Sequence, residues 1–378
     1  MHLEYFILLT LAAGATSFVV VASIALIIRK AVDVQRQRRR THLYQHYSAK
    51  LAELLLTDLP EIPPDSKTGG IARQYELLVL PMKKRMSKMD PGRRMFHRQA
   101  LRSVLVDLAL DVTGETADRL VYFFSSLGFV QEHIQLLRSK KWWVRAQAAR
   151  DLGLLRARKA IPTLTLLLED RNDGARYQAM QSLVTLAGVE SLRTILRIAK
   201  RLSPWMAIEL SVIVMRFEDA AVPYLIEALK SPDQSVVLFS IEMLAEIGFV
   251  SAVEPLRALL TEYPSSVVQA KAAEALGRLG DKRAEEALLR LVGSPHPHLR
   301  TKAIEALGQI GSPSALPTLL RQFAKGSLTE KITTARSIAS LGQEGAETIR
   351  SLAGDPDELN RSVAQQVAEE CSLEIAGS

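Results

Sequence analysis

One segment recurs along the chain and limits its fold more than any other feature. It is a ten-residue stretch with small and apolar residues at three-to-four spacing, as in VRAQAARDLG and LRTKAIEALG. Its copies begin at Val144, Ala175, Met206, Val236, Val268, Leu299, Thr333 and Leu359. The period of about 31 residues suits a helix, a turn and a second helix. Neither helix can bury its apolar face alone, so the copies are expected to stack into a solenoid.

The segments VRAQAARDLGLLRARKAIPTLTLLLED and LRTKAIEALGQIGSPSALPTLL resemble HEAT repeats of the short type named after the phycobilisome lyases (PBS lyase HEAT-like). The resemblance covers roughly residues 140–372 and implies an all-α fold, an α-solenoid of stacked helical pairs. The copies starting at Met206 and Val236 depart from the pattern, since they lack the arginine after the first apolar residue and part of the glycine turn. We expect residues 95–139 to form a degenerate N-terminal helical cap and residues 140–378 to form the array.

The N-terminal segment YFILLTLAAGATSFVVVASIALII has 24 residues and no charged side chain. About 20 apolar residues are enough to cross a bilayer as a helix, so residues 4–28 are expected to be a transmembrane anchor. Arg29 and Lys30 follow at once, which by the positive-inside bias places the N-terminus outside and the HEAT domain in the cytoplasm. The chain is thus expected in a plasma or bacterial inner membrane as a single-pass protein. A cleaved signal peptide is the alternative, but it would carry positive charge before the apolar run.

The positive charge of the chain is confined to the part that follows this segment. Residues 29–104 hold 17 Lys and Arg against 7 Asp and Glu, whereas residues 105–378 hold 31 and 33. A nucleic-acid-binding surface would need its basic residues on the large C-terminal part. Nucleic acid is therefore not expected as a partner.

Two parts of the basic region are candidates for contact with anionic lipid headgroups, where each Lys or Arg contributes about 1 kcal/mol. Residues 29–57 predict a juxtamembrane helix, because Leu43, Tyr47 and Leu51 keep helical spacing. Residues 58–94 predict a linker rich in Pro and Gly, followed by a second basic segment interleaved with methionines. The headgroup candidates are Arg36, Arg38, Arg39, Arg40, Lys83, Lys84 and Arg85. A topology signal with a solvated, flexible arm is the alternative interpretation.

The resemblance also implies a partner-binding face. In this family the helix with the VRxxAAxxLG pattern lines the concave side, so its variable positions are expected to meet a partner. The first copies offer aromatic and apolar side chains there, and the later copies offer cations. The expected partner-binding residues are Trp143, Tyr177, Trp205, Leu238, Phe239, Lys271, Lys302 and Arg336. An apolar half beside a basic half suits a protein segment such as an amphipathic helix with acidic residues.

These residues also have structural interpretations. The tryptophans and other apolar residues could be covered by the helices of the cap, and the basic column could be a solvated face. Trp143 and Trp205 hold the same repeat position two copies apart, so their exposure decides between the two interpretations. Arg145, Arg176 and Arg300 are expected to bond to nearby loop carbonyls or carboxylates and so to link the repeats.

Motifs for catalysis are missing from the sequence, which has no Gly-rich phosphate loop, no CxxC pair and no nucleophile elbow. His42 and His46 have the spacing of two metal ligands on a helix face, but no convincing third ligand lies nearby. The hydroxylase that matures hypusine resembles this fold, yet it needs His-Glu pairs, and the repeats contain no such dipeptide. With the single cysteine Cys371 no disulfide framework is possible. No catalytic residue, metal, cofactor or small-molecule substrate is expected.

Together these features predict a membrane-anchored cytoplasmic HEAT-repeat scaffold, without catalysis, that holds a protein partner in its concave groove. The partner is expected to be membrane-associated or recruited from the cytosol. Two alternatives remain open. One is a HEAT-like enzyme of modification or lyase type, and the other is a lipid-binding protein acting through its basic juxtamembrane region.

Overall fold

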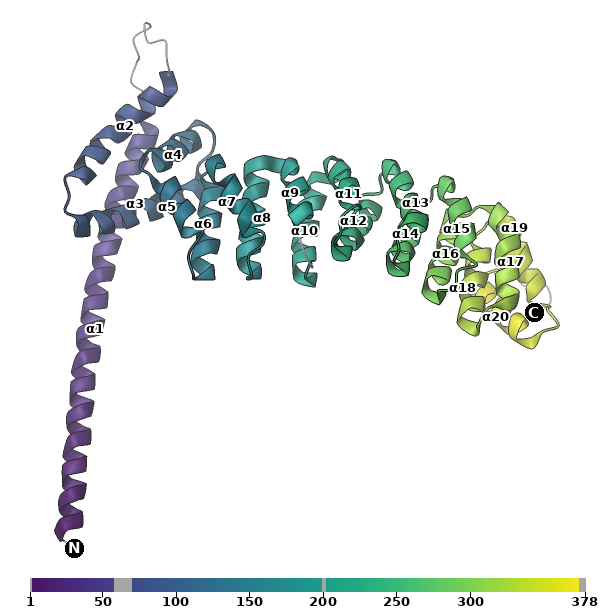
Figure 1. The fold of residues 1–378 in the computed structure, drawn as a ribbon, viewed down its shortest axis with the longest axis horizontal. Coiled ribbons are helices and arrows are strands. Elements are labelled where there is room, and N and C mark those ends of the chain that lie inside the picture. Colours follow the sequence, from purple (N-terminus) through teal and green to yellow (C-terminus); the bar gives the residue numbers. More distant parts are fainter. Residues whose placement is uncertain (1, 58–69, 199–201, 374–378) are drawn as a thin grey trace. The chain divides into compact units, whose positions relative to one another are not determined.

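The computed structural model describes residues 2–57, 70–198 and 202–373, with side chains described from residue 22 and, after the first gap, from residue 73. Every element in these ranges is a helix (Figure 1). The expected all-α fold is therefore confirmed for the described residues. The chain divides into two compact units, Met1–Ile161 and Pro162–Ser378.

Unit 1 is organised around one long helix, α1. Its elements are α1 (His2–Leu56), α2 (Gly70–Ser87), α3 (Pro91–Asp111), α4 (Gly114–Ser126), α5 (Phe129–Leu136), α6 (Trp142–Leu154) and the 3-10 turn η1 (Arg158–Ala160). Helix α1 has 55 residues without a break. Among the residues with described side chains, no helix is long and apolar enough to cross a membrane. Residues 4–21 of the expected anchor at 4–28 lie outside that set, so the anchor stays a prediction.

The core of unit 1 includes a helix that the sequence placed in a linker. Tyr75, Val79 and Met82 of α2 are at most 6% exposed. They pack in one cluster with Leu51 of α1 and Phe123 of α4. The expected linker and basic segment at 58–94 is therefore corrected, because residues 70–87 form a core helix; residues 58–69 lie outside the described residues. The buried side chains are four and three residues apart and share one face, and Lys84 and Arg85, which follow Met82, are exposed.

Unit 2 is built of helix pairs that repeat as expected. Its α-helices are α7 (Ile161–Leu167), α8 (Asp173–Ala187), α9 (Ser191–Ile198), α10 (Pro204–Phe217), α11 (Val222–Ala228), α12 (Gln234–Ile247), α13 (Val253–Glu262), α14 (Ser266–Leu279), α15 (Glu285–Leu291), α16 (Pro297–Ile310), α17 (Leu316–Lys325), α18 (Leu328–Ala339), α19 (Gln343–Leu352) and α20 (Glu358–Glu370). The even-numbered helices from α8 to α20 contact one another in sequence order and form one layer. Odd-numbered helices pack against this layer, as α13 does against α14 and α17 against α18. The predicted stacking is thus confirmed.

Arginines in the first turns of the repeat helices tie each helix to the preceding loop. In unit 2, Arg176 donates to the Asp170 carbonyl at 3.2 Å, and Arg300 donates to the Ser294 carbonyl at 2.6 Å. In unit 1, Arg145 donates to the carbonyl six residues before it at 2.7 Å. These charge-assisted bonds satisfy carbonyls that follow the preceding helix. The predicted linking role of these three arginines is confirmed.

Small residues let neighbouring helices of the even-numbered layer approach closely. A Cβ added to Gly277 of α14 would lie 2.7 Å from the Ala306 Cα of α16, and one added to Gly308 of α16 would lie 2.8 Å from the Ser337 Cα of α18. Favourable carbon contacts lie at about 3.5–4.0 Å. A side chain at either glycine would therefore push two backbones apart.

Ion pairs join α12, α14 and α16 on the exposed side of this layer. Lys271 of α14 pairs with Glu242 of α12 and with Glu274 of its own helix. Lys302 of α16 lies 3.6 Å from Glu274 and 2.9 Å from Glu305. The five side chains alternate in sign across three helices, and we call them the ion ladder.

The ion ladder shifts the pKa values of Lys271 and Glu242. Burial alone would lower the pKa of Lys271, but its hydrogen bonds to the Glu242 and Glu274 carboxylates outweigh burial and raise it. Burial alone would raise the pKa of Glu242, but Lys271 and Arg278 outweigh burial and lower it below its usual value. Both shifts favour the charged forms of these two side chains.

The close approach at Gly308 predicts that Gly308→Ala destabilises unit 2, although alanine is the better helix former. Helix propensity favours alanine by about 1 kcal/mol, whereas overpacking costs about 1–3 kcal/mol. Thermal unfolding followed by circular dichroism should therefore show a lower Tm. Gly293→Ala is the control, because a Cβ there meets only the Arg290 carbonyl at 3.8 Å. A Tm for Gly308→Ala at or above the parent value would contradict the close approach.

Glu242→Gln should make stability less dependent on pH. The pKa of Glu242 in the folded chain lies below its usual 4.5, so its contribution is complete above that pH and is lost as pH falls through the folded value. Because the pair is partly exposed, the variant should lose at most about 1 kcal/mol in urea unfolding at pH 7. At pH 3 the difference should shrink. Glu286→Gln, which removes an exposed pair within one helix, should change little at either pH, and an equal loss for Glu242→Gln at both pH values would refute the ladder's role.

Candidate partner-binding site

Helix α10 exposes an apolar stripe on unit 2. Trp205, Ile208, Val212 and Met215 are 43%, 63%, 54% and 39% exposed. They are three, four and three residues apart, so they lie along one side of the helix. The other side is apolar too, and its Leu210 is fully buried. Glu209 and Arg216 flank the exposed side. The four exposed apolar residues between these charges and the neighbouring helices, here named the α10 stripe, are left without a cover in unit 2.

Tyr177 of α8 widens the stripe at its start. The ring centroids of Tyr177 and Trp205 are 5.4 Å apart with an interplanar angle of 59°. The start of α10 holds Trp205 in this position, because Ser203 accepts a hydrogen bond from the Met206 amide at 3.2 Å and Pro204 occupies the first turn. The structure thus brings two of the expected partner-binding residues together as one aromatic pair.

The α10 stripe differs from the three repeats that follow it at one position. The repeat position of Val212 is occupied by Glu242 in α12, Glu274 in α14 and Glu305 in α16. Those three carboxylates belong to the ion ladder. Helix α10 therefore carries an exposed apolar side chain where the next three even-numbered helices carry a carboxylate. Val212 and Met215 were not among the expected residues, although a comparison of this position between copies would have singled out Val212.

The expectation for α12 is corrected at one position. Phe239 is only 8% exposed and lies in the core of unit 2, whereas Leu238 is half-buried. Consecutive residues point about 100° apart around a helix. The two neighbouring positions of the repeat therefore cannot both face a partner, and in α12 the larger side chain faces inward.

The expected basic half of the face consists of paired charges. Lys271 and Lys302 are held in the ion ladder by carboxylates on both sides. Arg336 of α18 lies 2.8 Å from Glu370 of α20. The later repeats thus present neutralised pairs, and the expected preference for an acidic partner loses its basis.

Trp143 is exposed in unit 1. Its side chain is 55% exposed, and that of Trp142 is 44% exposed. Their rings meet edge-on with centroids 6.2 Å apart, and the Lys141 ammonium lies 5.6 Å from the centre of the Trp143 ring. The helices of residues 95–139 therefore leave about half of each tryptophan side chain accessible to a partner.

The predicted headgroup contacts lie on two helices of unit 1. Arg36, Arg38, Arg39 and Arg40 are exposed on α1. On α2, Lys84 and Arg85 are exposed, while Lys83 donates a hydrogen bond to Glu76 at 2.8 Å. Lys83 is therefore already paired, whereas the four arginines of α1 are exposed, with Arg36 and Arg40 on one side of the helix and Arg38 and Arg39 on others.

The described residues do not form a metal-binding cluster, since no group of three or more of their His, Cys, Asp or Glu side chains is arranged to hold a metal ion. The His42 and His46 spacing thus gains no third ligand from a neighbouring described helix.

The repeat array matches a known family. The family profile for HEAT repeats matches residues 130–216, 206–276 and 253–330, together more than half of the chain. No curated protein matches the chain significantly in sequence.

Solved structures with a similar fold are remote in sequence. An engineered protein is 20% identical, over 86% of this chain and 99% of that one, with a TM-score of 0.39. Kap121p is 12% identical, over 86% and 45% of the two chains, with a TM-score of 0.36. Human deoxyhypusine hydroxylase in complex with glycerol is 17% identical, over 80% and 99%, with a TM-score of 0.29. At these values the likeness concerns the fold alone.

The profile match covers the same helix pairs that stack in the structure at a period of about 31 residues. On these grounds the chain belongs to the family of HEAT-repeat proteins.

Proposed function

We propose that this chain, a HEAT-repeat protein of the short phycobilisome-lyase-like type, is a membrane-anchored scaffold that binds an amphipathic helix of a protein partner. The proposed contact surface is the α10 stripe together with Tyr177. The observation that carries the proposal is the exposure of four apolar side chains along one side of α10. Binding, rather than catalysis, is the proposed role.

The spacing of the stripe favours a helical occupant. Apolar residues three and four apart are the pattern by which two helices pack side chains into one another's grooves. Burying one large apolar side chain contributes about 1.5–3 kcal/mol, so four of them supply a substantial part of an interface. Trp205 and Tyr177 are of the types that dominate binding energy at interfaces. The proposed partner segment therefore carries its own apolar residues at three-to-four spacing.

The site requires apolar residues on the partner helix but does not require a particular charge. The carboxylates of Glu242 and Glu274 and the ammonium groups of Lys271 and Lys302 are already paired. Rim charges of this kind mainly affect association rate and salt dependence. An acidic helix is therefore not required, and a neutral amphipathic helix satisfies the site.

Attachment to a membrane is proposed from the sequence. Residues 5–28 are uncharged, and Arg29 and Lys30 follow them. The continuity of α1 into the core of unit 1 supports the proposal, because Leu51 on this helix is fully buried. An anchor at the start of α1 would thus hold unit 1 at the membrane, with the N-terminus outside and the repeats in the cytoplasm of a plasma or bacterial inner membrane.

A photo-crosslinking residue at position 208 should trap the partner helix in membranes of the native cells. The full chain is needed, because α1 and α2 supply Leu51 and Val79 to the core of unit 1. Peptide mapping of the adduct should return a segment with apolar residues at three-to-four spacing. Position 250 is the control, since Val250 is 62% exposed and lies outside the stripe. The same adducts at both positions, no adduct, or an adduct with a second copy of this chain would refute a separate partner helix.

Val212→Glu should abolish this adduct without unfolding unit 2. A glutamate is the residue that α12, α14 and α16 carry at this position, so the helix tolerates it, whereas an apolar interface does not. Trp205→Ala should weaken binding of the mapped peptide by about 30-fold, the loss typical of an interface hot spot. Val250→Glu is the matched control for added charge. Retained crosslinking in Val212→Glu, with an unchanged Tm, would remove the stripe from the interface.

The proposed topology is testable with the chain's single cysteine. Cys371 is exposed, so a membrane-impermeant maleimide should label it only after intact cells are permeabilised. A cysteine introduced by His2→Cys, in a Cys371→Ser background, should be labelled from outside. Labelling of Cys371 in intact cells would reverse the proposed orientation, and release of the chain by alkaline carbonate would contradict the anchor.

A further inference from the structure

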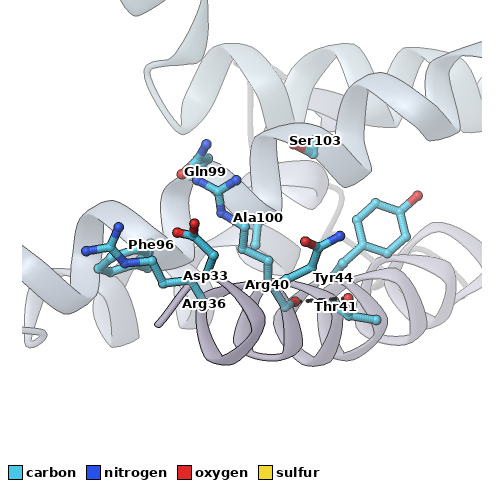
Figure 2. A pocket seen from close by; sticks show the side chains of 10 residues that line it. Asp33, Arg36, Arg40, Thr41, Tyr44, Phe96, Gln99, Ala100 and Ser103 are labelled. Carbon is cyan, nitrogen blue, oxygen red and sulfur yellow. Dashed lines mark hydrogen bonds between the residues drawn. The ribbon is translucent and has the colours of Figure 1, made fainter. Parts of the chain in front are cut away.

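A groove of about 720 Å³ lies between α1 and α3 in unit 1. Figure 1 shows that the N-terminal half of α1 extends beyond the helices that pack around its other end. The lining of the groove includes Asp33, Arg36, Arg40 and Tyr44 of α1 together with Phe96 and Gln99 of α3. Figure 2 shows Arg36 and Arg40 extending from α1 toward α3.

The two arginines supply free cationic donors. They are four residues apart, so they stand one above the other on the same side of α1. Within the described part of the chain, neither guanidinium forms an ion pair or a hydrogen bond. The Tyr44 hydroxyl, by contrast, already donates to the Asp107 carboxylate at 2.9 Å. Two guanidinium groups at this spacing match the donor arrangement that binds phosphate oxygens.

One exposed aromatic ring in an otherwise mostly polar lining favours an amphiphile over a free anion. Phe96 lines the groove and is 44% exposed; its neighbour Met95, outside the lining, is 62% exposed. A free phosphate gains nothing from such side chains, whereas the glycerol and upper acyl carbons of a lipid pack against them. The combination of unpaired arginines and an exposed aromatic ring is the chemistry of a membrane interface.

The place of the groove along α1 also fits a lipid headgroup, provided that the anchor of the proposed function holds. Arg36 comes eight residues after Ile28, which corresponds to about 12 Å along the helix. The headgroup layer extends about 5–8 Å from the hydrocarbon core. Helical side chains tilt toward the N-terminus of their helix, so the long Arg36 side chain leans back to the edge of that layer. Arg40 starts about 18 Å along the helix and lies at the end of the groove farther from the membrane.

We propose that the α1–α3 groove binds the phosphate group of an anionic phospholipid, held by Arg36 and Arg40, with the lipid's glycerol region against Phe96. Asp33 is the one carboxylate that lines the groove, and it forms no ion pair with either arginine among the described residues. It repels the bound phosphate and limits affinity, which keeps the lipid exchangeable.

The test uses the full chain purified in a nonionic detergent, with bound lipid counted by native mass spectrometry. Phosphatidylglycerol should be retained in preference to phosphatidylcholine. The double variant Arg36→Gln/Arg40→Gln should lose about 25-fold in affinity for phosphatidylglycerol, since each cationic contact contributes about fivefold. Arg38→Gln/Arg39→Gln removes the same charge from the same helix, but neither residue lines the groove. This control should lose less than about threefold.

Asp33→Asn should strengthen retention of phosphatidylglycerol by about fivefold, because it removes a like charge near the phosphate. This gain cannot come from misfolding, so it keeps the proposal testable even if the double arginine variant is unstable. A weaker retention in Asp33→Asn would instead indicate a headgroup with an ammonium group and would overturn the anionic assignment.

Two further results would refute the groove. An equal loss in both double arginine variants would mean diffuse attraction to the whole helix. Displacement of the lipid by inorganic phosphate at equal concentration would mean a site for a free anion. Because lipid is counted in detergent, these outcomes do not depend on the partner site at α10 or on whether residues 4–28 cross a bilayer.

Discussion

Close contact between neighbouring backbones, permitted by glycine and alanine, is the constraint on which the order of unit 2 depends. Where Gly277 meets Ala306 and Gly308 meets Ser337, there is no room for a further side chain. These contacts fix the register of one helix against the next. Only in a fixed register does Lys271 reach a carboxylate on the preceding helix. The ion ladder is thus a consequence of backbone packing and adds little stability of its own.

A fixed register also allows one helix to differ from its neighbours without disturbing the stack. Leu210 keeps the buried side of α10 in the core, so the exposed side is free to vary. At that side α10 carries Val212 where three other helices carry glutamate. A single exposed valine is common on protein surfaces, and Val212 carries weight because Trp205, Ile208 and Met215 extend it into one apolar patch.

The sequence was sufficient for the repeat and insufficient for the faces of individual helices. The period was predictable because apolar spacing recurs in all copies, and the arginine bonds were predictable because three copies carry arginine at the same position, directly after the first residue. The core helix α2 was missed because Pro81 and the basic run that follows Met82 suggested a solvated segment, although Tyr75, Val79 and Met82 share one face. At α12, which neighbour of a pair points inward depends on helix rotation, and Phe239 was therefore misplaced. Ion pairing of Lys271 across repeats needed the register that only packing supplies.

The continuity of α1 has a geometric consequence for everything attached to it. An α-helix turns by about 100° and advances by about 1.5 Å with each residue. Between Ile28 and Leu43, nearly every described side chain of α1 is exposed, and the helix has no break. One residue added there would rotate the groove and the rest of unit 1 by about 100° around the helix axis, whereas seven would restore the azimuth to within about 20°. If the start of α1 is held in a bilayer, the length of this stretch sets the direction in which unit 1 faces its neighbours in the membrane plane.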